Sequence, residues 1–440
     1  MMQHIRNSLL EKMILPIGDR MLGGSFMTEL KELRTMKGHL HQQMQKLKNV
    51  LDHATEHSPY YRNFHVQRKG DPVEYLRQFP ILTKADLRQH TADMLTQPME
   101  GLTRECSSGT SGFQSIVHWT KREQSQHRAT QLLWWEWAGY RIGDPLVQTG
   151  ITPDRKLIKG IKDKLFNTYY LQAFSHSQDD VAKAFAWAKK KKEPVLAGYA
   201  SSLYVLAQFA EKMDVNLHFK TAIAWGDKMF PHYRKLIESV FSTRVHETYG
   251  SAEGLMMGAQ KDLDYMYQMN SNVFMEILDD DGQPVKEGEM GHVIVTNLNA
   301  YAMPLIRYRI GDLARMLPKE DYPSERELHF PLIEKVIGRD TDLVRTPGGK
   351  MMVVHSFTGI FEHIPQISQF KIIQEKLEGI TIEFVRGEGF HETLLGKVET
   401  NILNNIREPF EIIFKEMKAI SPSPSGKPQL IVSRIAAKKP

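Results

Sequence analysis

The sequence predicts an α/β protein with a β-rich part and a small α+β C-terminal part. Residues 222–248 alternate a short apolar run, a helical pattern and a second apolar run, which is typical of an α/β sheet packed between helices. The runs 273–278 and 292–296 flank a turn-rich linker and predict an antiparallel hairpin with a long loop. From residue 369 onward a third pattern of strands around one helix begins.

Helical patterns occur at several places in the chain. Apolar residues at spacings of three and four predict a helix over 39–57; they are Leu40, Met44, Leu47 and Leu51. Thr83 precedes a short helical run and is a predicted N-cap. Further helices are expected at 121–140, 179–190, 201–212 and 231–241.

The C-terminal part is predicted to be a separate small domain of about 100 residues. Its elements are strands at 369–375 and 380–385, a helix at 391–406, and strands at 411–415 and 430–432. A charged and glycine-rich stretch, 338–350, precedes it. We therefore place a boundary at Gly338–Asp342 and expect domains at 1–338 and 339–440, the second acting as a mobile lid.

Composition excludes several classes of protein. The 440 residues include 57 Lys and Arg against 52 Asp and Glu, a net charge of +5, with 41% apolar and 25% charged residues, so a disordered or fibrous chain is excluded. The single cysteine, Cys106, excludes an internal disulfide and cysteine-rich metal sites. No uncharged apolar run approaches the roughly 20 residues of a membrane span. The patch Met13–Ile17 is too short and too charged at its flanks for a signal peptide. We expect a cytoplasmic protein without an integral membrane segment.

The basic run Lys189–Lys192 ends a predicted helix. Lysines in a last helical turn are favourable with the helix dipole, so we interpret the run as a solvated helix end and expect no nucleic-acid partner. A weak contact with a membrane surface is left open.

The most distinctive local motif consists of six small or hydroxylated residues: Ser107, Ser108, Gly109, Thr110, Ser111 and Gly112. Glycines allow close approach of the backbone to a ligand, and successive N–H groups can form an anion site. No Gly-Lys-Ser/Thr follows, so this is not a Walker A loop. Taken alone, the run fits a plain flexible loop as well as a phosphate cradle.

Two carboxylates are candidates for nucleotide binding. Glu253 lies in Tyr249–Gly254, directly after a predicted strand, and could hold Mg²⁺. Asp312 follows Gly311 and could accept two hydrogen bonds from a vicinal diol such as ribose. Either residue, read alone, also fits an ordinary turn.

A lysine near the C-terminus, Lys427, lies in a loop rich in proline and serine. It can reach a phosphate as a point charge, but in isolation it fits an exposed solubilising lysine better. None of the 18 histidines has a metal-like spacing such as His-Glu-x-x-His, and we predict no zinc site.

Taken together and in this order, the motifs resemble those of the adenylate-forming ligases. The order is Ser-Ser-Gly-Thr-Ser-Gly, Tyr-Gly-x-x-Glu, Tyr-x-x-Gly-Asp, Gly-Arg-x-x-Asp and a late Ser-Gly-Lys. Within that superfamily the chain is most similar to the phenylacetate–CoA ligase branch, including its capsule-biosynthesis relatives. The runs 58–62, 79–87 and 302–309 add to the similarity, which extends from about Leu51 to Arg434.

This resemblance implies a reaction and a set of site residues. A carboxylic acid, aromatic or fatty, attacks the α-phosphate of MgATP, pyrophosphate leaves, and the acyl-adenylate passes to coenzyme A as the thiol acceptor. By resemblance, Ser107–Gly112 cradle the phosphates and Glu253 binds Mg²⁺. The ribose is held by Asp312 and Arg339, and Lys427 acts during adenylation. The adenine and acyl pocket is lined by Gly226, Asp227, Thr248, Tyr249 and Gly250.

The sequence departs from the ligase pattern at three places. Phe113 follows the phosphate loop where Lys-Pro is common. Asp340-Thr341-Asp342 replaces the paired acids of the hinge, and Trp225-Gly226-Asp227 stands where Gly-Ala-Glu-Pro is common. These departures bear on pyrophosphate handling, the hinge and the acyl pocket.

Three functions stay open from the sequence. The first is an acid–thiol ligase that makes an acyl-CoA through an adenylate. The second passes the adenylate to an amine or carrier protein, or transfers AMP to a hydroxyl. The third is a catalytically silenced nucleotide-binding protein. The identity of the acid and the oligomeric state, a homodimer included, are also open.

Overall fold

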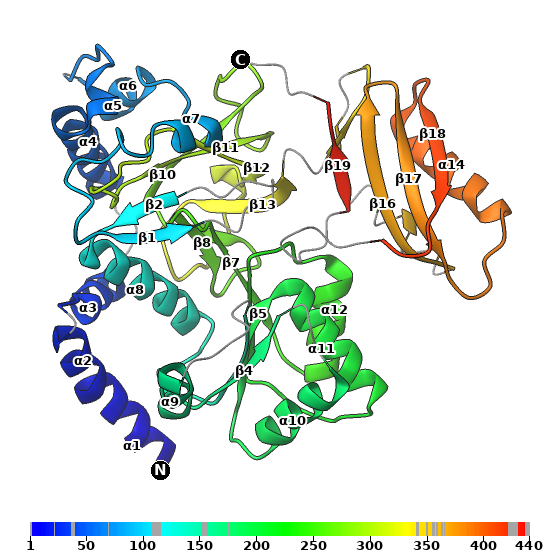
Figure 1. Ribbon diagram of the computed structural model, residues 1–440, viewed down its shortest axis with the longest axis horizontal. Helices are drawn as coiled ribbons and strands as arrows, with labels where there is room; N and C mark the ends of the chain where they lie inside the picture. Colours follow the sequence, from blue (N-terminus) through cyan, green and yellow to red (C-terminus); the bar gives the residue numbers. More distant parts are fainter. Residues whose placement is uncertain are drawn as a thin grey trace.

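The computed structural model describes most of the chain. The described residues are 2–21, 23–36, 40–68, 70–106, 116–150, 157–173, 177–339, 343–348, 351–353, 357, 360–361, 364, 366–420 and 430–435. Their largest feature is a mixed sheet of eleven strands, in the order β10-β11-β12-β13-β9-β8-β7-β6-β5-β3-β4 (Figure 1).

One half of this sheet is parallel and is connected through helices. Its strands are β3 (Leu146–Gly150), β4 (Thr168–Gln172), β5 (Val195–Tyr199), β6 (Thr221–Trp225) and β7 (Val245–Gly250). The connecting helices are α9 (Leu157–Leu165), α10 (Gln178–Lys189), α11 (Ala200–Lys212) and α12 (Pro231–Phe241). Apolar side chains of α10, α11 and α12 bury one face of the strands. The predicted α/β architecture is confirmed.

The other half of the sheet is antiparallel and begins where β7 pairs with β8. Its strands are β8 (Met256–Gln260), β9 (Met266–Gln268), β10 (Val273–Leu278), β11 (Met290–Asn297), β12 (Tyr308–Met316) and β13 (Leu332–Arg339). The expected hairpin is β10–β11, in which Val273 pairs with Asn297. A short 3₁₀ turn, η2 (Lys319–Asp321), lies between β12 and β13.

Helices dominate the N-terminal part. They are α1 (Met2–Leu9), the π turn η1 (Leu10–Ile14), α2 (Leu15–Met21), α3 (Phe26–Thr35), α4 (Leu40–His57), α5 (Pro59–Arg62), α6 (Pro72–Arg77) and α7 (Lys84–Gln89). The paired strands β1 (Thr103–Cys106) and β2 (Ile116–Trp119) and helix α8 (Lys121–Trp137) follow. Thr83 caps α7 in a capping box as predicted, and Thr120 caps α8 in the same way.

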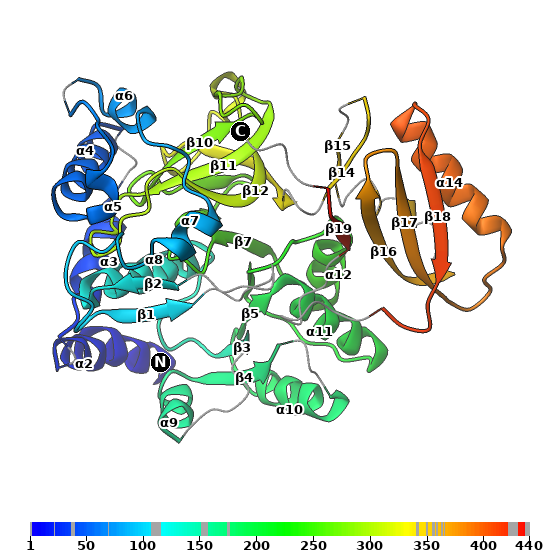
Figure 2. The ribbon, with the colours of Figure 1, turned by 45° about the horizontal axis from the view of Figure 1, so that its top comes forward.

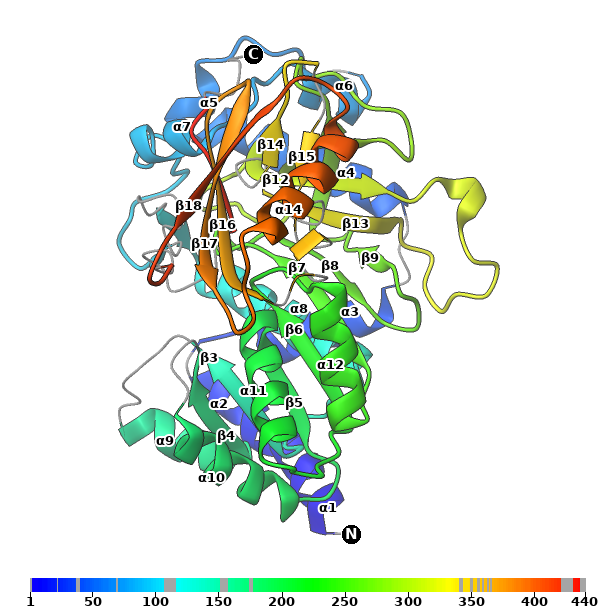
Figure 3. The same ribbon diagram turned by 90° about the vertical axis from the view of Figure 1, so that its right-hand side faces the viewer.

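The C-terminal part contains two smaller sheets. One pairs β14 (Leu343–Arg345) with β15 (Met351–Val353). The other has the order β18-β17-β16-β19, formed by β16 (Ile367–Lys376), β17 (Gly379–Arg386), β18 (Glu411–Glu416) and β19 (Ile431–Ser433). Helix α14 (Thr393–Ile406) packs on this sheet through Leu394, Val398, Ile402 and Ile406, and Figure 3 shows both in front of the rest of the chain.

The division into domains at residues 338 and 339 stays a prediction. Residues 340–342 lie outside the described part, while Gly338 and Arg339 end β13 of the large sheet. Phe230, at the start of α12, belongs to the apolar cluster of the C-terminal part. Among the described residues, no helix is both long and apolar enough to cross a membrane.

Candidate functional site

The carboxyl ends of β5, β6 and β7 lie next to one another, and the predicted nucleotide-site residues follow them. Gly226, directly after β6, has a φ of +79°, a conformation that L side chains rarely adopt. A Cβ at this position would lie 2.5 Å from Cε1 of Tyr199 at the end of β5. Glycine is therefore required for the tyrosine ring to pack against the loop. Ligands of α/β sheets bind at such strand ends.

Asp227 holds this loop to the start of α11. Its Oδ2 accepts hydrogen bonds from the backbone N–H of Ser201, at 3.2 Å, and from the Ser201 hydroxyl. A carboxylate at a helix N-terminus is favoured by the unpaired N–H groups and the helix dipole. Asp227 thus fixes the position of Gly226 relative to α11. Burial and the Asp227 charge raise the pKa of the nearby Tyr233 to about 12.

Tyr249 and Asp312 are in contact although 63 residues separate them. The Tyr249 hydroxyl donates a hydrogen bond to Oδ2 of Asp312 at 2.8 Å. Asp312 lies within strand β12, not on the turn that the sequence indicated, and pairs with Arg339 of β13. The side chain of Arg339 is outside the described set. Thr248, one residue earlier on β7, donates from its hydroxyl to the carbonyl of Ala224 at 3.2 Å.

Glu253 lies on the turn between β7 and β8 and is 8% exposed. The hydroxyl of the buried Tyr308 donates to its Oε1 at 3.3 Å. Tyr308 and Asp312 both belong to β12 and stand four residues apart, with Gly311 between them at a φ of +84°. Strand β12 therefore carries Asp312 and, through Tyr308, also contacts Glu253. Gly250, the last residue of β7, pairs with Met256 of β8.

The turn of Glu253 also contacts the strand that follows the serine- and glycine-rich loop. Gly254 has a φ of +86°, and a Cβ there would lie 2.4 Å from Cζ2 of Trp119 on β2. Cys106 of β1 pairs with Ile116 of β2, so the two strands that flank residues 107–115 are neighbours. Behind Trp119 and Gly254 lies a small pocket that includes His127, and burial lowers the pKa of this histidine to about 4.

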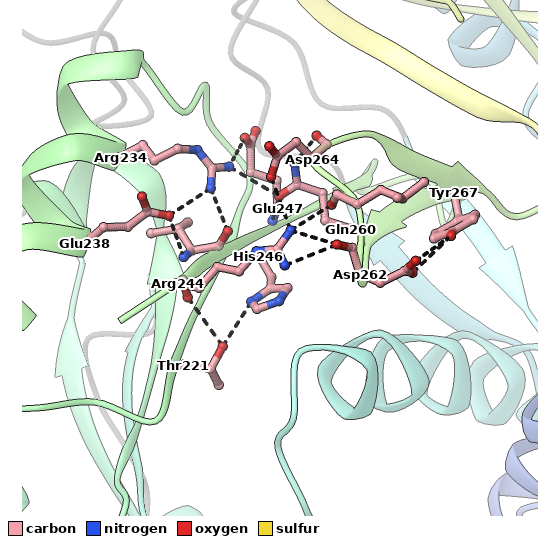
Figure 4. Close-up of polar contacts among 12 residues, drawn as sticks. Thr221, Arg234, Glu238, Arg244, His246, Glu247, Gln260, Asp262, Asp264 and Tyr267 are labelled. Carbon is pink, nitrogen blue, oxygen red and sulfur yellow. Dashed lines mark hydrogen bonds and ion pairs between the residues drawn. The ribbon is translucent and has the colours of Figure 1, made fainter. Parts of the chain in front are cut away.

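A network of polar side chains, several of them only partly buried, supports β7 next to the site (Figure 4). Arg234 of α12 contacts Oε1 of Glu247 at 2.6 Å and Oε1 of Glu238 at 3.1 Å. Gln260 of β8 accepts from the backbone N–H of Glu247 at 2.9 Å. Burial raises the pKa of Glu247, and Arg234 opposes this effect. These contacts tie α12, β7 and β8 together directly before Thr248 and Tyr249.

His246 belongs to the same region of β7. Its Nδ1 lies 3.0 Å from the hydroxyl of Thr221 on β6 (Figure 4). Burial, with smaller contributions from Arg244 and Arg234, lowers the pKa of His246 to about 4. The ring is consequently neutral at pH 7 and acts as a structural hydrogen-bonding group.

Several predicted site residues fall outside the described residues. They are Ser107, Ser108, Gly109, Thr110, Ser111, Gly112 and Lys427, together with the departures Phe113 and Thr341. The structure thus brings together Gly226, Asp227, Thr248, Tyr249 and Gly250 with Glu253 and Asp312, and the role of every predicted site residue stays a prediction.

Sequence reasoning missed three residues that position this site. Ser201 holds Asp227, Tyr308 contacts Glu253, and the Nζ of Lys228 donates to the carbonyl of Ile337. The last contact joins the loop after β6 to β13 beside Gly338. Tyr308 had a sequence signal, because it stands in the same short motif as Asp312.

The metal hypothesis is compatible with the donor set. Within the described ranges, no group of three or more His, Cys, Asp or Glu side chains is arranged to hold a metal ion. Mg²⁺ needs fewer protein ligands than zinc, because it is usually bound by one or two carboxylates together with substrate phosphates and water. Glu253 alone therefore fits a magnesium site that is completed by a nucleotide.

Comparison with known proteins gives relatives in sequence and in fold. The chain matches no protein-family model. It is 24% identical to a phenylacetate–coenzyme A ligase of Pseudomonas putida over 350 residues, which cover 76% of this chain and 77% of the relative. It is 22% identical to the protein CapK of Staphylococcus aureus over 429 residues, 92% of each chain.

A solved structure of 2-hydroxyisobutyryl-CoA ligase in the postadenylation state, in complex with R3-HIB-AMP, is similar in fold. Its TM-score is 0.69 at 17% identity, and the match covers 89% of this chain and 88% of that one. An open conformation of the same ligase, in complex with 2-HIB-AMP and CoA, has a TM-score of 0.62. At these identities the structural likeness concerns the fold.

Proposed function

Since the chain is an adenylate-forming, phenylacetate–coenzyme A ligase-like protein, we propose that it activates a carboxylic acid with ATP and transfers the acyl group to coenzyme A. The acid is proposed to be aromatic or fatty, because aromatic side chains surround the strand ends. Trp225 stacks on Trp135 with ring centroids 5.6 Å apart, and Tyr199 packs against Gly226.

One observation carries this proposal most directly. The hydrogen bonds from Tyr249 to Asp312 and from Tyr308 to Glu253 bring two carboxylates from distant segments to one end of β7. These hydrogen bonds hold both carboxylates in fixed positions. A nucleotide site needs fixed acceptors for ribose hydroxyls and for a metal ion, because catalysis of phosphoryl-type transfer depends on positioning and charge stabilisation.

Within this proposal, Asp312 accepts hydrogen bonds from the ribose hydroxyls and Arg339 lies beside it. Glu253 and the phosphate oxygens would hold Mg²⁺, which would neutralise charge that develops on the phosphates. Ser107–Gly112 are proposed to cradle the β- and γ-phosphates. Gly226, Thr248 and Gly250 leave room for adenine and the acyl group, and Asp227 keeps that loop in place through Ser201.

The proposed chemistry has two steps. A carboxylate oxygen attacks the α-phosphorus of ATP while the bond from that phosphorus to the bridging pyrophosphate oxygen breaks, with Lys427 close to the α-phosphate. The sulfur of coenzyme A then attacks the acyl carbon, and AMP leaves with the oxygen that came from the acid. The thiol proton passes to solvent.

The experiment that tests the function is a panel of carboxylic acids assayed with MgATP for pyrophosphate release, with and without coenzyme A. We expect at least one aromatic or fatty acid to give pyrophosphate, AMP and a thioester in equal amounts. Asp312→Ala, assayed at low ATP, serves as the impaired control, and Met99→Gln, an exposed substitution outside the site, as the active control.

Two other outcomes identify the alternatives. Steady pyrophosphate release that does not depend on coenzyme A assigns the adenylate to a different acceptor. No release with any acid, from a protein that binds ATP, contradicts the proposal and favours a silenced nucleotide-binding protein.

A further inference from the structure

The N-terminal helical segment, α1–η1–α2, exposes a row of apolar side chains. Eight large hydrophobic side chains are exposed among the described residues, and five of them belong to this segment at intervals of four residues. They are Ile5 (58% exposed), Leu9 (45%), Met13 (53%), Ile17 (56%) and Met21 (81%). A sixth, Leu165, ends the neighbouring helix α9. We call these six side chains the apolar row.

The opposite side of the segment is attached to the protein largely through polar contacts. Gln3 and Asn7 donate to Oδ1 of Asp144 at 3.3 and 2.8 Å. Arg6 donates to the carbonyls of Lys164 and Leu165 at 3.1 and 2.7 Å. A helix on a protein surface normally buries its apolar face and exposes its polar face. Here the arrangement is largely reversed, although Leu10 is buried.

The π turn η1 keeps the apolar row on one side. In an α-helix, a step of four residues exceeds one turn by roughly 40°, so five such positions would spread around the helix. A π turn contains more residues per turn, and a step of four then falls short of a full turn. Because η1 lies in the middle of the row, it offsets part of the drift. Pro16 lies directly after this π turn, at the second position of α2.

Exposed basic side chains occur on the same helices as the apolar row. Lys12 and Arg20 are exposed on the segment itself, and Lys162 and Lys164 are exposed on α9. The run 189–192 lies at the same edge of the sheet, because Lys220 contacts both Asp144 and the carbonyl of Pro194. Figures 1 and 2 show α1, α9 and the N-terminus together at one end of the molecule.

We propose that this end of the protein docks on the surface of an anionic phospholipid bilayer. The apolar row enters the region between head groups and acyl chains, and the surrounding lysines and arginines contact the lipid phosphates and carboxylates. An in-plane helix with apolar residues on one face and basic residues beside them is typical of such binding. A symmetric contact with a second copy is disfavoured, because it would bring the same basic rim together from both sides.

Docking of this kind leaves the candidate site accessible. Asp144 and Pro194 lie at the amino ends of the parallel strands, whereas Gly226 and Tyr249 lie at their carboxyl ends. The inference is therefore independent of the proposed function. Variants of the apolar row are expected to keep full activity toward dissolved substrates.

The test is co-sedimentation of the full-length protein with large vesicles of phosphatidylcholine alone and of phosphatidylcholine with about 30% phosphatidylserine. We expect binding to the mixed vesicles to be roughly tenfold or more tighter, and to fall when the salt concentration is raised from 0.1 to 0.5 M. The variant Leu9→Ser/Met13→Ser/Ile17→Ser should lose binding. Its matched control, Met99→Ser/Ile413→Ser, changes exposed apolar residues elsewhere and should keep it.

A second pair of variants tests the charge. Lys162→Gln/Lys164→Gln should weaken binding to the mixed vesicles by roughly tenfold or more, while Lys397→Gln/Lys418→Gln, exposed elsewhere, should not. Equal binding by the serine variant and the native protein overturns the proposal, as does failure of the native protein to bind any vesicle. If the native protein forms a dimer, does not bind vesicles, and loses the dimer in the serine variant, this face contacts a second copy of the chain. That result also overturns the membrane proposal.

Discussion

The contact between Tyr249 and Asp312 allows a direct test of the ribose assignment. If Asp312 holds the ribose, the phenol of Tyr249 positions its carboxylate through the 2.8 Å hydrogen bond. Tyr249→Phe removes this hydrogen bond and keeps the ring, whereas Asp312→Ala removes the carboxylate. Since Tyr249 acts on ATP through Asp312, the two substitutions should not be additive.

The size of each effect follows from the kind of bond. A hydrogen bond to a charged group contributes about 1.5–3 kcal/mol, and about 1.4 kcal/mol corresponds to a tenfold change in affinity. Asp312→Ala should weaken ATP binding by roughly 10- to 100-fold. Tyr249→Phe should weaken it by up to roughly tenfold, because the carboxylate is still present but less well held. The double variant should bind ATP about as weakly as Asp312→Ala alone.

Isothermal titration with ATP, in a double-mutant cycle, measures this coupling. Tyr308→Phe is the matched control, because its hydroxyl contacts Glu253 and not Asp312 among the contacts described above, so its effect should add to that of Asp312→Ala. Independent, additive effects of Tyr249→Phe and Asp312→Ala would refute the positioning role. Unchanged ATP affinity in folded Asp312→Ala would refute the ribose assignment itself.

Four further predictions follow from the same structure. Glu253→Gln should lower the rate of pyrophosphate release far more than it weakens ATP binding, and normal turnover at low Mg²⁺ would remove Glu253 from the site. Lys427→Ala should slow adenylation by a factor on the order of hundreds yet spare thiolysis of a supplied acyl-adenylate, so equal slowing of both steps would contradict its role. Gly254→Ala should lower the unfolding free energy by about 1–3 kcal/mol in urea titrations, because Gly254 has a left-handed backbone conformation and the added Cβ would collide with Trp119. A change below about 0.5 kcal/mol would show that the indole moves aside. The pKa of His246 is lowered from its usual 6.5 to about 4, so the unfolded state binds the proton first as the pH falls. The free energy of unfolding should therefore fall by up to about 3 kcal/mol as the pH drops from 6.5 to 4. Urea titrations across this range should show a flatter pH profile for His246→Gln, and a profile identical to that of the native protein would exclude the histidine as the cause.

The sequence predicted the elements whose signals are local. The helix over 39–57, the cap at Thr83 and the hairpin of β10 and β11 are confirmed because spacing, capping chemistry and turn residues act within a few residues. Helix α14 and the strands around it were predicted for the same reason.

The long-range features could not be predicted from local patterns. The antiparallel strands continue the parallel sheet through the pairing of β7 with β8, and this joining depends on contacts between distant segments. Asp312 fits a turn by its neighbour Gly311, yet it lies in a strand because Gly311, with a φ of +84°, is accommodated within β12. The contact of Tyr249 with Asp312 likewise has no local signal, and only the resemblance to a family placed both residues in one site.

The N-terminal helix was missed for a physical reason of its own. Ile5, Leu9, Met13 and Ile17 recur every four residues, but they face solvent, and Pro16 seemed to interrupt the pattern. The π turn before α2 accommodates the proline, an arrangement that spacing rules for α-helices do not consider.

The central claim is that a carboxylate oxygen of the substrate forms a bond to the α-phosphorus of ATP. Turnover of an accepted acid labelled with ¹⁸O in both carboxylate oxygens, followed by mass spectrometry of the nucleotide product, tests this bond most directly. The proposed mechanism predicts AMP that carries one ¹⁸O atom from the acid. Unlabelled AMP, or ADP as the nucleotide product, would contradict it.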